Sequence, residues 1–350
     1  MTESKEKLFN LERQLFELEM KDHWDNADFD LSRELREEIK NVKEEMKKML
    51  SNDNYYKSTG YMSASLLKQF IKCEHTALAM YKGDYSLTKN TAMLVGGFVD
   101  AWCEGTLSEY QNNNPELFNK KIIELPDTAE RVSNIRPEFV TKNGKLKKDK
   151  ISQIKKELPE LFGCELTLKS DFVNAQEIIN TISNNELFMD FLTGEKQKIV
   201  TGEIEGVPFK GKLDIYNGER IVDLKIMRSC ERVMGKSLVE HWGYDIQLAI
   251  YQELVYQELG KKLPCYLAIA TKEEPADLAI VEVNQMNLDT AMDYIKNILP
   301  RIKQIINGDV KARHCNHCEY CRETKELKII DSDLLGMSDE DIFYVTGKED

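Results

Sequence analysis

The chain has 350 residues, 41% of them hydrophobic, which is enough for one large domain or two modest ones with a core. No run approaches the roughly 18 consecutive apolar residues of a membrane helix, and the first residues, MTESKEKLFN, lack the apolar stretch of a secretory signal, so we expect a cytoplasmic protein without a membrane partner. The formal net charge of −13 does not favour nucleic acid as a partner, but it excludes none, because binding depends on how charge is distributed.

Residues 1–54 are predicted to form a helical hairpin. Apolar residues recur there at helical spacings of three and four, and Asp25–Asp28 supplies the turn. The two apolar stripes consist of Leu8, Leu11, Leu15 and Leu18, and of Leu31, Leu35, Ile39, Val42, Met46 and Met49. The hairpin either covers a neighbouring surface or serves as an arm for oligomerisation or partner binding, and the residues leave both interpretations open.

Two further helices are predicted before the central part of the chain. Ser63 is expected to cap a helix that carries Cys73, and a second helix is expected over Thr91–Gly105. Residues 110–170 are polar and lysine-rich, and we expect them to form loops and short helices on the surface.

The central part of the chain alternates strand-like and helical segments, namely strands at 198–205, 207–216 and 220–227, a helix at 243–259, a strand at 264–271 and a helix at 288–306. The pair Asn217-Gly218 is a strong hairpin-turn signal between the second and third strands. This order predicts an α/β fold with a mixed sheet flanked by helices. We expect one domain over residues 55–328, followed by an acidic tail at 329–350.

Charged residues interrupt two of the predicted strands. Asp223 and Lys225 lie two residues apart, so a strand places them on one face. Asp214 interrupts the preceding strand, which the turn makes an antiparallel neighbour. Two adjacent carboxylates repel each other unless a cation lies between them, and hard oxygen ligands suit Mg²⁺ or Mn²⁺. The alternative is an Asp–Lys–Asp salt-bridge network on an exposed sheet face.

Gln247 and Tyr251 lie four residues apart on the predicted helix and therefore share a face. Both side chains can donate hydrogen bonds to phosphate or to the strand carboxylates. The alternative places Tyr251 in the core and Gln247 in solvent.

In this order and spacing, Gly211-x-Leu213-Asp214, Asp223-Leu224-Lys225 and Gln247-x-x-x-Tyr251 resemble the RecB-type nuclease pattern of the PD-(D/E)xK superfamily. The chain more closely resembles the PDDEXK-like domain of phage exodeoxyribonuclease VIII-like (RecE-type) proteins, over roughly residues 55–328. The matching stretches are Ser63–Glu74, Val95–Asp100, Thr201–Gly206 and Trp242–Tyr251. The resemblance implies a restriction-endonuclease-like core.

The same resemblance implies roles for individual residues. Asp214 and Asp223 would be metal ligands, Lys225 the catalytic lysine, and Leu224 would offer its backbone carbonyl to the metal. Asp100 stands where many relatives place a histidine ligand, and an oxygen ligand there suits Mg²⁺. Glu203 is a further acidic candidate.

The cysteines are grouped in a way that favours metal binding over disulfides, with Cys315, Cys318 and Cys321 close together and Cys73 a distant fourth. Some RecB-type nucleases resemble this arrangement and hold a four-iron, four-sulfur cluster, although the last gap is shorter here. Zinc is the alternative, either with four thiolates or with His314 or His317 completing the site. The remaining cysteines are expected to be buried thiols without a special role, at positions Cys103, Cys164, Cys230 and Cys265.

The resemblance implies an exonuclease that degrades one strand of linear duplex DNA and hands the product to a single-strand annealing protein during phage recombination, in the host cytoplasm. Related exonucleases form rings around DNA, which makes a homo-oligomer one possibility, with residues 1–50 as the candidate arm. Two alternatives remain: a structure-specific or single-strand nuclease, and a non-catalytic DNA-binding scaffold on the same fold. Metal-dependent cleavage distinguishes the scaffold from the enzymes.

Overall fold

The computed structural model describes residues 3–48, 50, 55–56, 58, 60–125, 127–327 and 331–346. The chain divides into two compact units, of which the first comprises Met1–Thr88 and Asn185–Asp350 and the second Lys89–Asn184. The second unit is therefore inserted within the range that the sequence analysis treats as one nuclease domain. Every residue of the sheet described next belongs to the first unit.

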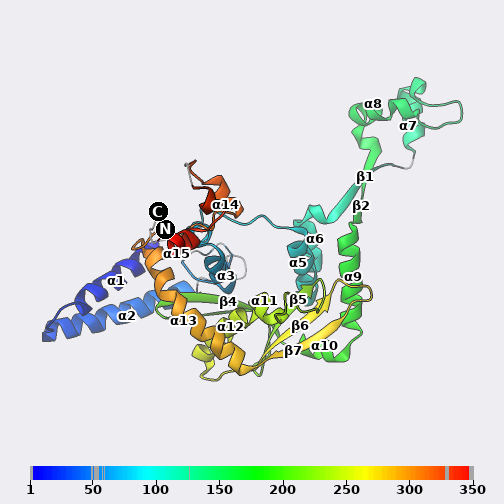
Figure 1. Cartoon of the computed structure of the whole chain (residues 1–350). Helices are drawn as coiled ribbons and strands as arrows, with labels where there is room; N and C mark the ends of the chain where they lie inside the picture. The colour runs from blue at the N-terminus through cyan, green and yellow to red at the C-terminus, as the bar shows by residue number, and fades with distance from the viewer. Residues whose placement is uncertain are drawn as a thin grey trace. The chain divides into compact units, whose positions relative to one another are not determined.

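The first unit is built around a five-stranded mixed sheet (Figure 1). Its strands lie side by side in chain order: β3 (Glu195–Ile204), β4 (Val207–Tyr216), β5 (Ile221–Met227), β6 (Cys265–Thr271) and β7 (Leu278–Val283). Only β5 and β6 run parallel, and the other neighbours are antiparallel. The turn between β4 and β5 contains Gly218 with a φ of 84°, a backbone conformation that glycine adopts without a steric penalty.

Helices flank this sheet, which confirms the predicted α/β class. Apart from α1 and α2, the helices of this unit are α3 (Ala64–Lys72), α4 (Glu74–Lys82), α10 (Glu186–Phe191), α11 (Leu238–His241), α12 (Tyr244–Leu259), α13 (Gln285–Asn307), α14 (Glu319–Glu323) and α15 (Asp339–Thr346), with η5 (Ser332–Leu334) near the end. Helix α12 connects the parallel strands and packs against β3, β4, β5 and α13. The core between them includes Phe209, Leu213, Leu254 and Leu299, all fully buried.

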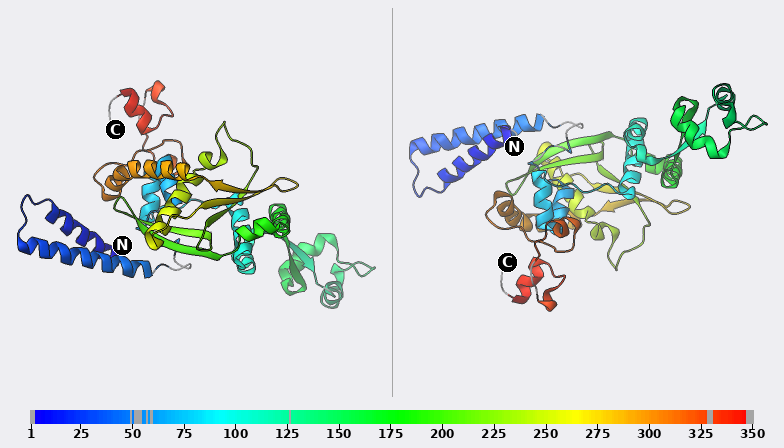
Figure 2. Two further views of the ribbon diagram at one scale, coloured as in Figure 1. Left: turned by 90° about the horizontal axis from the view of Figure 1, so that it is seen from below. Right: turned by 90° about the horizontal axis from the view of Figure 1, so that it is seen from above.

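Residues 3–48 form the predicted helical hairpin, with α1 at Glu3–Glu19 and α2 at Asn26–Lys48 (Figure 2). Six leucine, isoleucine and valine side chains are buried between the helices: Leu8, Leu11, Leu18, Leu35, Ile39 and Val42. Leu31 was expected in this stripe but is exposed, in the second turn of α2. The predicted stripe residue Met49 and the side chain of Met46 lie outside what the structure describes.

The second unit contains α5 (Thr91–Glu104), α6 (Leu107–Asn113), η1 (Pro115–Leu117), β1 (Phe118–Glu124), α7 (Thr128–Ile135), η2 (Pro137–Phe139), η3 (Lys148–Lys150), α8 (Ile151–Glu157), η4 (Pro159–Leu161), β2 (Phe162–Leu168) and α9 (Ser170–Ser183). Strands β1 and β2 pair antiparallel over seven residues each. The expectation of only loops and short helices at 110–170 was therefore wrong. The two strands flank a long insertion rather than a tight turn, so the local pattern carried no hairpin signal.

Local predictions around the first helices hold well. Ser63 caps α3, since its hydroxyl accepts a hydrogen bond from the backbone N–H of Leu66. Among the scattered cysteines, Cys265 is buried as expected, but Cys164 is exposed and Cys103 and Cys230 are only half-buried. Cys164 is exposed because it lies in the two-stranded ribbon of β1 and β2, which has no second layer to cover both faces. No helix in the described part of the chain is long and apolar enough to cross a bilayer.

Candidate active site

The two predicted carboxylates lie on adjacent strands of the first unit. Asp214 is on β4 and Asp223 on β5, and the hairpin pairs Ile215 with Val222 and Tyr216 with Ile221. Continuing this antiparallel register by one residue places Asp214 opposite Asp223. The turn that the sequence predicted therefore brings the two acids together.

Asp214 connects the two strands through its side chain. Its Oδ2 accepts a hydrogen bond from the backbone N–H of Leu224 at 3.0 Å, and its Oδ1 accepts one from Gln197 Nε2 at 3.4 Å. The Nζ of Lys225 lies 3.9 Å from Oδ2. The carboxylate is thus oriented by β3 and β5 while it remains partly accessible, with its side chain 21% exposed.

Asp223 is a buried charge, only 1% exposed. Its Oδ1 accepts a hydrogen bond from Gln247 Nε2 at 2.7 Å, and its Oδ2 forms an ion pair with Lys225 Nζ. That Oδ2 accepts no hydrogen bond from the residues that the structure describes. Burying an ionised carboxylate lowers the free energy of unfolding unless cations compensate its charge. Asp223 therefore reduces the stability of the fold to the extent that its charge is not compensated.

Lys225 lies between the two acids. Besides its two ion pairs, its Nζ donates a hydrogen bond to the carbonyl oxygen of Leu224 at 3.1 Å and lies 5.6 Å from the ring centre of Tyr244. The alternative of an exposed salt-bridge network does not describe this arrangement, because Asp223 is buried and the Lys225 side chain is 21% exposed. Lys225 Nζ thus contacts both carboxylates and the Leu224 carbonyl.

Helix α12 supplies the next two predicted residues. Gln247 Nε2, which binds Asp223, also lies 3.3 Å from the hydroxyl of Tyr251. Tyr251 is buried in the core, and burial followed by the charges of Asp223 and Asp214 raises the pKa of its hydroxyl well above the usual value. A Cβ atom at Gly211 would lie 3.0 Å from the Tyr251 ring, so glycine in the Gly-x-Leu-Asp motif leaves room for this tyrosine.

Lys68 on α3 also reaches this cluster, although it was not among the predicted site residues. Its Nζ donates to Gln247 Oε1 at 3.3 Å and to the Trp242 carbonyl at 3.5 Å. Burial lowers the pKa of Lys68 to about 8, against the opposing effect of the Asp223 charge. The side chain lies on a helix far away in sequence, so no local pattern marks it as part of the site.

Two other acidic candidates belong to other segments of the chain, α5 and the far end of β3. Asp100 belongs to α5 in the second unit, where its charge adds to burial in raising the pKa of Tyr110. Its place in a metal site stays a prediction. Glu203 is exposed at the far end of β3, opposite Pro208. Since Pro208 precedes Asp214 by six residues of β4, Glu203 is roughly 20 Å along the strand from the cluster.

A divalent cation fits the donor set of this cluster. Asp214 and Asp223 offer carboxylate oxygens, and the Leu224 carbonyl accepts from the same Lys225 Nζ that pairs with both acids. Asp223 Oδ2 is buried and, beyond this ion pair, accepts no hydrogen bond from the described residues. Carboxylate and carbonyl oxygens are the ligands that Mg²⁺ and Mn²⁺ prefer. The arrangement can hold such a cation beside a lysine ammonium, a combination suited to a negatively charged phosphate.

Residues 63–324 match a protein family described as "PDDEXK-like domain of unknown function (DUF3799)". The chain belongs to this PDDEXK-like family. The matched range includes every residue of the cluster just described and excludes the α1–α2 hairpin. The mixed sheet with its flanking helices is the fold expected for that family.

Solved structures were compared with this PDDEXK-like chain as well. A crystal structure of a protein from Eubacterium rectale, described as a candidate exonuclease, is similar at 33% identity and a TM-score of 0.65, covering 82% of this chain and 97% of that one. A structure of the protein SSO0001 reaches 16% identity and a TM-score of 0.26, covering 76% of this chain and 96% of that one, which is too low to support an argument. The comparison with curated proteins found no match.

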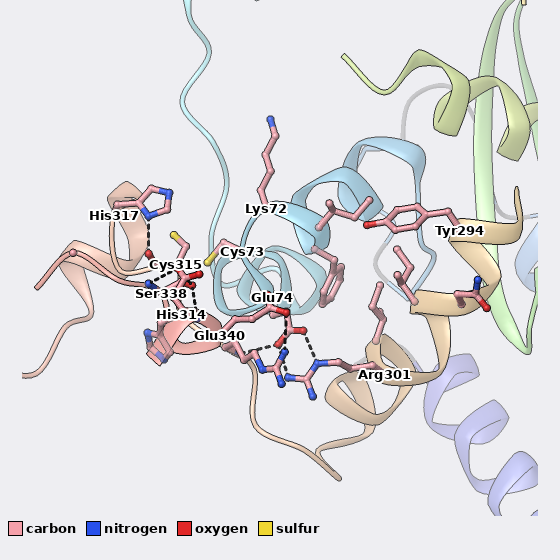
Figure 3. Close-up of a pocket in the computed structure, with 18 residues that line it drawn as sticks. Lys72, Cys73, Glu74, Tyr294, Arg301, His314, Cys315, His317, Ser338 and Glu340 are labelled. Atoms are coloured by element: carbon pink, nitrogen blue, oxygen red, sulfur yellow. Dashed lines mark hydrogen bonds and ion pairs between the residues drawn. The ribbon is translucent and has the colours of Figure 1, made fainter. Parts of the chain in front are cut away.

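The PDDEXK-like domain also contains the four cysteines expected to bind metal, and the fold brings them together. Their sulfur atoms lie within 4.8 Å of one another in the group Cys73, Cys315, Cys318 and Cys321. Cys73 comes from the end of α3, while the other three come from the loop and short helix α14 after α13. Cys73 thus completes the group, and neither histidine does. His317 Nδ1 lies 2.6 Å from the Cys315 carbonyl (Figure 3), and His314 stacks on His75.

Hydrogen bonds around the cysteine group distinguish its members. The hydroxyl of Thr76 lies 3.3 Å from Cys73 Sγ and 3.1 Å from Cys318 Sγ. Burial raises the pKa of the Cys318 thiol, but the bonds from Thr76 and from the backbone N–H of Cys321 outweigh it and lower that pKa to about 6. Burial raises the pKa of Cys315 and Cys321 instead. Thr76 therefore helps to orient two potential ligands.

Proposed function

We propose that this protein is a metal-dependent DNA exonuclease that hydrolyses one strand of linear duplex DNA. The observation that carries the proposal is the sharing of one ammonium group, Lys225 Nζ, by the carboxylates of Asp214 and Asp223 on adjacent strands. Membership in the PDDEXK-like family supports a nuclease, and the similar Eubacterium rectale protein is described as a candidate exonuclease.

In this proposal the chain's own residues have separate tasks. Asp214, Asp223 and the Leu224 carbonyl would hold Mg²⁺ or Mn²⁺, and Gln247 fixes the orientation of Asp223 through its hydrogen bond to Oδ1. When bound, the cation would lower the pKa of water and offset negative charge on the phosphate. Lys225 holds a positive charge beside these carboxylates and is placed to stabilise negative charge that develops on the phosphate.

Lys68 adds a second cationic group behind this arrangement. Because it donates to Gln247 Oε1, it fixes the amide so that Gln247 Nε2 faces Asp223. Tyr251 supports the same amide from the core side. We assign both residues to positioning, since both bind the side-chain amide of Gln247. Asp100 remains a proposed further ligand from α5.

Digestion of end-labelled linear duplex DNA tests the proposal. With Mg²⁺ we expect loss of the linear duplex and survival of a closed circle, no cleavage in EDTA, and no cleavage by Lys225→Gln. Lys272→Gln is the matched control, because Lys272 is an exposed lysine that follows β6. Cleavage of the circle would indicate an endonuclease, and absence of metal-dependent cleavage of any DNA would favour the non-catalytic scaffold.

We further propose that the product passes to a single-strand annealing protein in phage recombination. The support is the resemblance of the motifs around Asp214, Asp223 and Gln247 to RecE-type proteins. Such a partner requires a 3′-tailed product, so the polarity of digestion decides it. Labels placed separately at the 5′ and 3′ ends should show release of the 5′ label first. Release of the 3′ label first would contradict this role.

For the four cysteines we propose a single tetrahedral metal ion with a structural role, zinc by this geometry. A zinc–sulfur bond of about 2.3 Å implies sulfur separations of about 3.8 Å, and the pairs here include 3.5 Å for Cys73 with Cys321 and 4.0 Å for Cys315 with Cys321. A four-iron, four-sulfur cluster places eight atoms between the same thiolates and requires wider separations. Metal analysis of anaerobically purified protein tests this: stoichiometric zinc in a colourless protein is expected, and iron with a broad absorbance near ~400 nm would identify the cluster instead.

A further inference from the structure

The second unit carries a concentration of positive charge in an otherwise acidic chain. Residues 142–156 contain seven lysines and one aspartate, a formal charge of +6, whereas the whole chain carries −13. None of these lysines belongs to the proposed active site. Charge segregated in this way creates a local potential that the net charge of the protein conceals.

These lysines lie on a packed module and not on a loose loop. The module is formed by α7, α8 and the turns between them, and its core is Val132, Phe139, Leu146, Ile154 and Leu161. Leu146 lies in the middle of the lysine run and is buried, and it pairs with Val140 in an isolated bridge. The backbone N–H of Thr141 also binds the Lys145 carbonyl at 2.8 Å. The charges are therefore held on a defined surface.

The charges of the module are not neutralised by its own acids. Lys142, Lys145, Lys148 and Lys156 are exposed, and none of them forms an ion pair with a carboxylate in the described part of the chain. The nearby acids Glu138 and Glu157 are engaged by Arg136, at 3.5 and 3.3 Å. A row of exposed ammonium groups without partners is suited to a polyanion, because binding releases the counterions that such a polymer condenses.

The module lies at the end of the β1–β2 ladder away from α6 and α9 (Figure 1). Seven residues per strand give this ladder a length of about 23 Å. It therefore presents the lysines at a distance from the rest of the second unit, as a separate contact surface.

We propose that the surface formed by Lys142, Lys145, Lys148 and Lys156 binds the phosphate backbone of duplex DNA, as a grip in addition to the cleavage cluster. The inference rests on the proposed function, because it gives the same DNA substrate a second contact. A membrane-binding surface would combine basic residues with exposed large apolar side chains. Among the described residues, no large apolar side chain between 142 and 156 is exposed. The absence of base-reading geometry on such a surface predicts binding without sequence preference.

Binding of a fluorescent linear duplex in EDTA tests the grip without cleavage. The variant Lys142→Gln/Lys145→Gln/Lys148→Gln/Lys156→Gln should bind at least about tenfold more weakly at low salt, with a slope of log affinity against log salt shallower by up to about 3 to 4. The matched control makes the same charge change at exposed lysines outside the module, Lys40→Gln/Lys82→Gln/Lys261→Gln/Lys296→Gln, and should retain more of the slope. Pairwise variants, Lys142 with Lys145 and Lys148 with Lys156, should each give about half the change.

The outcomes separate this inference from the proposed function. Lysine-dependent duplex binding by a protein that cleaves no DNA would support the grip and overturn the nuclease. Cleavage with an affinity and salt slope unchanged in the fourfold variant would overturn the grip alone. Lysine-dependent binding to phosphatidylserine vesicles together with unchanged duplex binding would also overturn it. In a cleavage assay the fourfold variant should raise KM with little change in kcat, since the cluster that performs the chemistry is untouched.

Discussion

The carboxylate of Asp214 accepts a hydrogen bond from the backbone N–H of Leu224, so a side chain of β4 holds the backbone of β5 just beyond the last paired residues of the two strands. Asp214 therefore has two roles: it accepts a hydrogen bond that stabilises the fold, and it supplies a negative charge for the proposed metal site. The Leu224 carbonyl, on the same residue, accepts from Lys225. The metal ligands proposed here are thus positioned by one another.

The two tasks of Asp214 can be separated by substitution. Asp214→Asn keeps an oxygen for the Leu224 N–H but removes the charge, so cleavage should fall by at least about a hundredfold. Its free energy of unfolding should stay close to the wild type. Asp214→Ala loses the acceptor too and should be less stable by about 1 kcal/mol. Initial cleavage rates measure the change in activity, and urea unfolding measures the change in stability. Full activity of Asp214→Asn would mean that Asp214 is not a metal ligand.

Lys225 compensates the buried charge of Asp223, whose side chain is only 2% exposed. Lys225→Met leaves that charge unpaired, so we expect a loss of about 3–5 kcal/mol in the free energy of unfolding without divalent cations. Mg²⁺ should restore part of this loss and should raise the unfolding temperature of the variant more than that of the wild type.

A double substitution provides the control for Lys225. Asp223→Asn removes the charge that Lys225 compensates, so Asp223→Asn/Lys225→Met should recover stability and lose the response to Mg²⁺. Equal Mg²⁺ responses in the wild type and in both variants would mean that the cation does not bind at this cluster.

Local patterns predicted the centre of the candidate site. The period of a strand put Asp223 and Lys225 on one face, and Asn217-Gly218 predicted the turn that brings Asp214 beside them. These inferences need only neighbours in sequence. Gln247 was identified by helical spacing, but its contact with Asp223 depends on how α12 packs on the sheet. The patterns therefore gave the residues and not the hydrogen bonds.

What the sequence did not predict depends on packing between distant segments. Lys68 reaches Gln247 from α3, and no spacing rule connects positions so far apart. Strands β1 and β2 are separated by the module of α7 and α8, so the usual short-turn signal is absent. Cys73 could be named only as a distant fourth ligand, because its distance in sequence from the other three cysteines gives no ligand spacing.

Gly211 gives a test of the contact between β4 and α12. In Gly211→Ala the new Cβ would lie 3.0 Å from Tyr251 Cδ1 and 3.1 Å from Val200 Cγ2, so the tyrosine must shift. We expect a loss of about 1–3 kcal/mol in the free energy of unfolding, and lower cleavage activity because Gln247 loses its support from Tyr251. Gly96→Ala on α5 is the control, since its Cβ meets nothing within 4 Å and alanine favours helix. Equal stability of the two variants would contradict the predicted crowding.

Lys68 makes the stability of the fold depend on pH in a direction that follows from its lowered pKa. In the unfolded chain a lysine keeps its proton up to about 10.5, whereas burial lowers the pKa of Lys68 in the fold to about 8. Between these values the unfolded state binds more protons, so the contribution of Lys68 to stability increases as pH rises. The change is at most about 3 kcal/mol.

Urea unfolding at pH 7 and at about pH 9.5 measures this dependence, because these values span most of the interval between the two pKa values. At pH 7 only the wild type must bury an ammonium group at this position. The free energy of unfolding of Lys68→Met should therefore exceed that of the wild type by more at pH 7 than at the higher pH. Lys296→Met, at an exposed lysine on α13, is the control and should change in parallel with the wild type. If Lys68→Met also changes in parallel, then Lys68 is not desolvated beside Gln247, and its positioning role is lost with it.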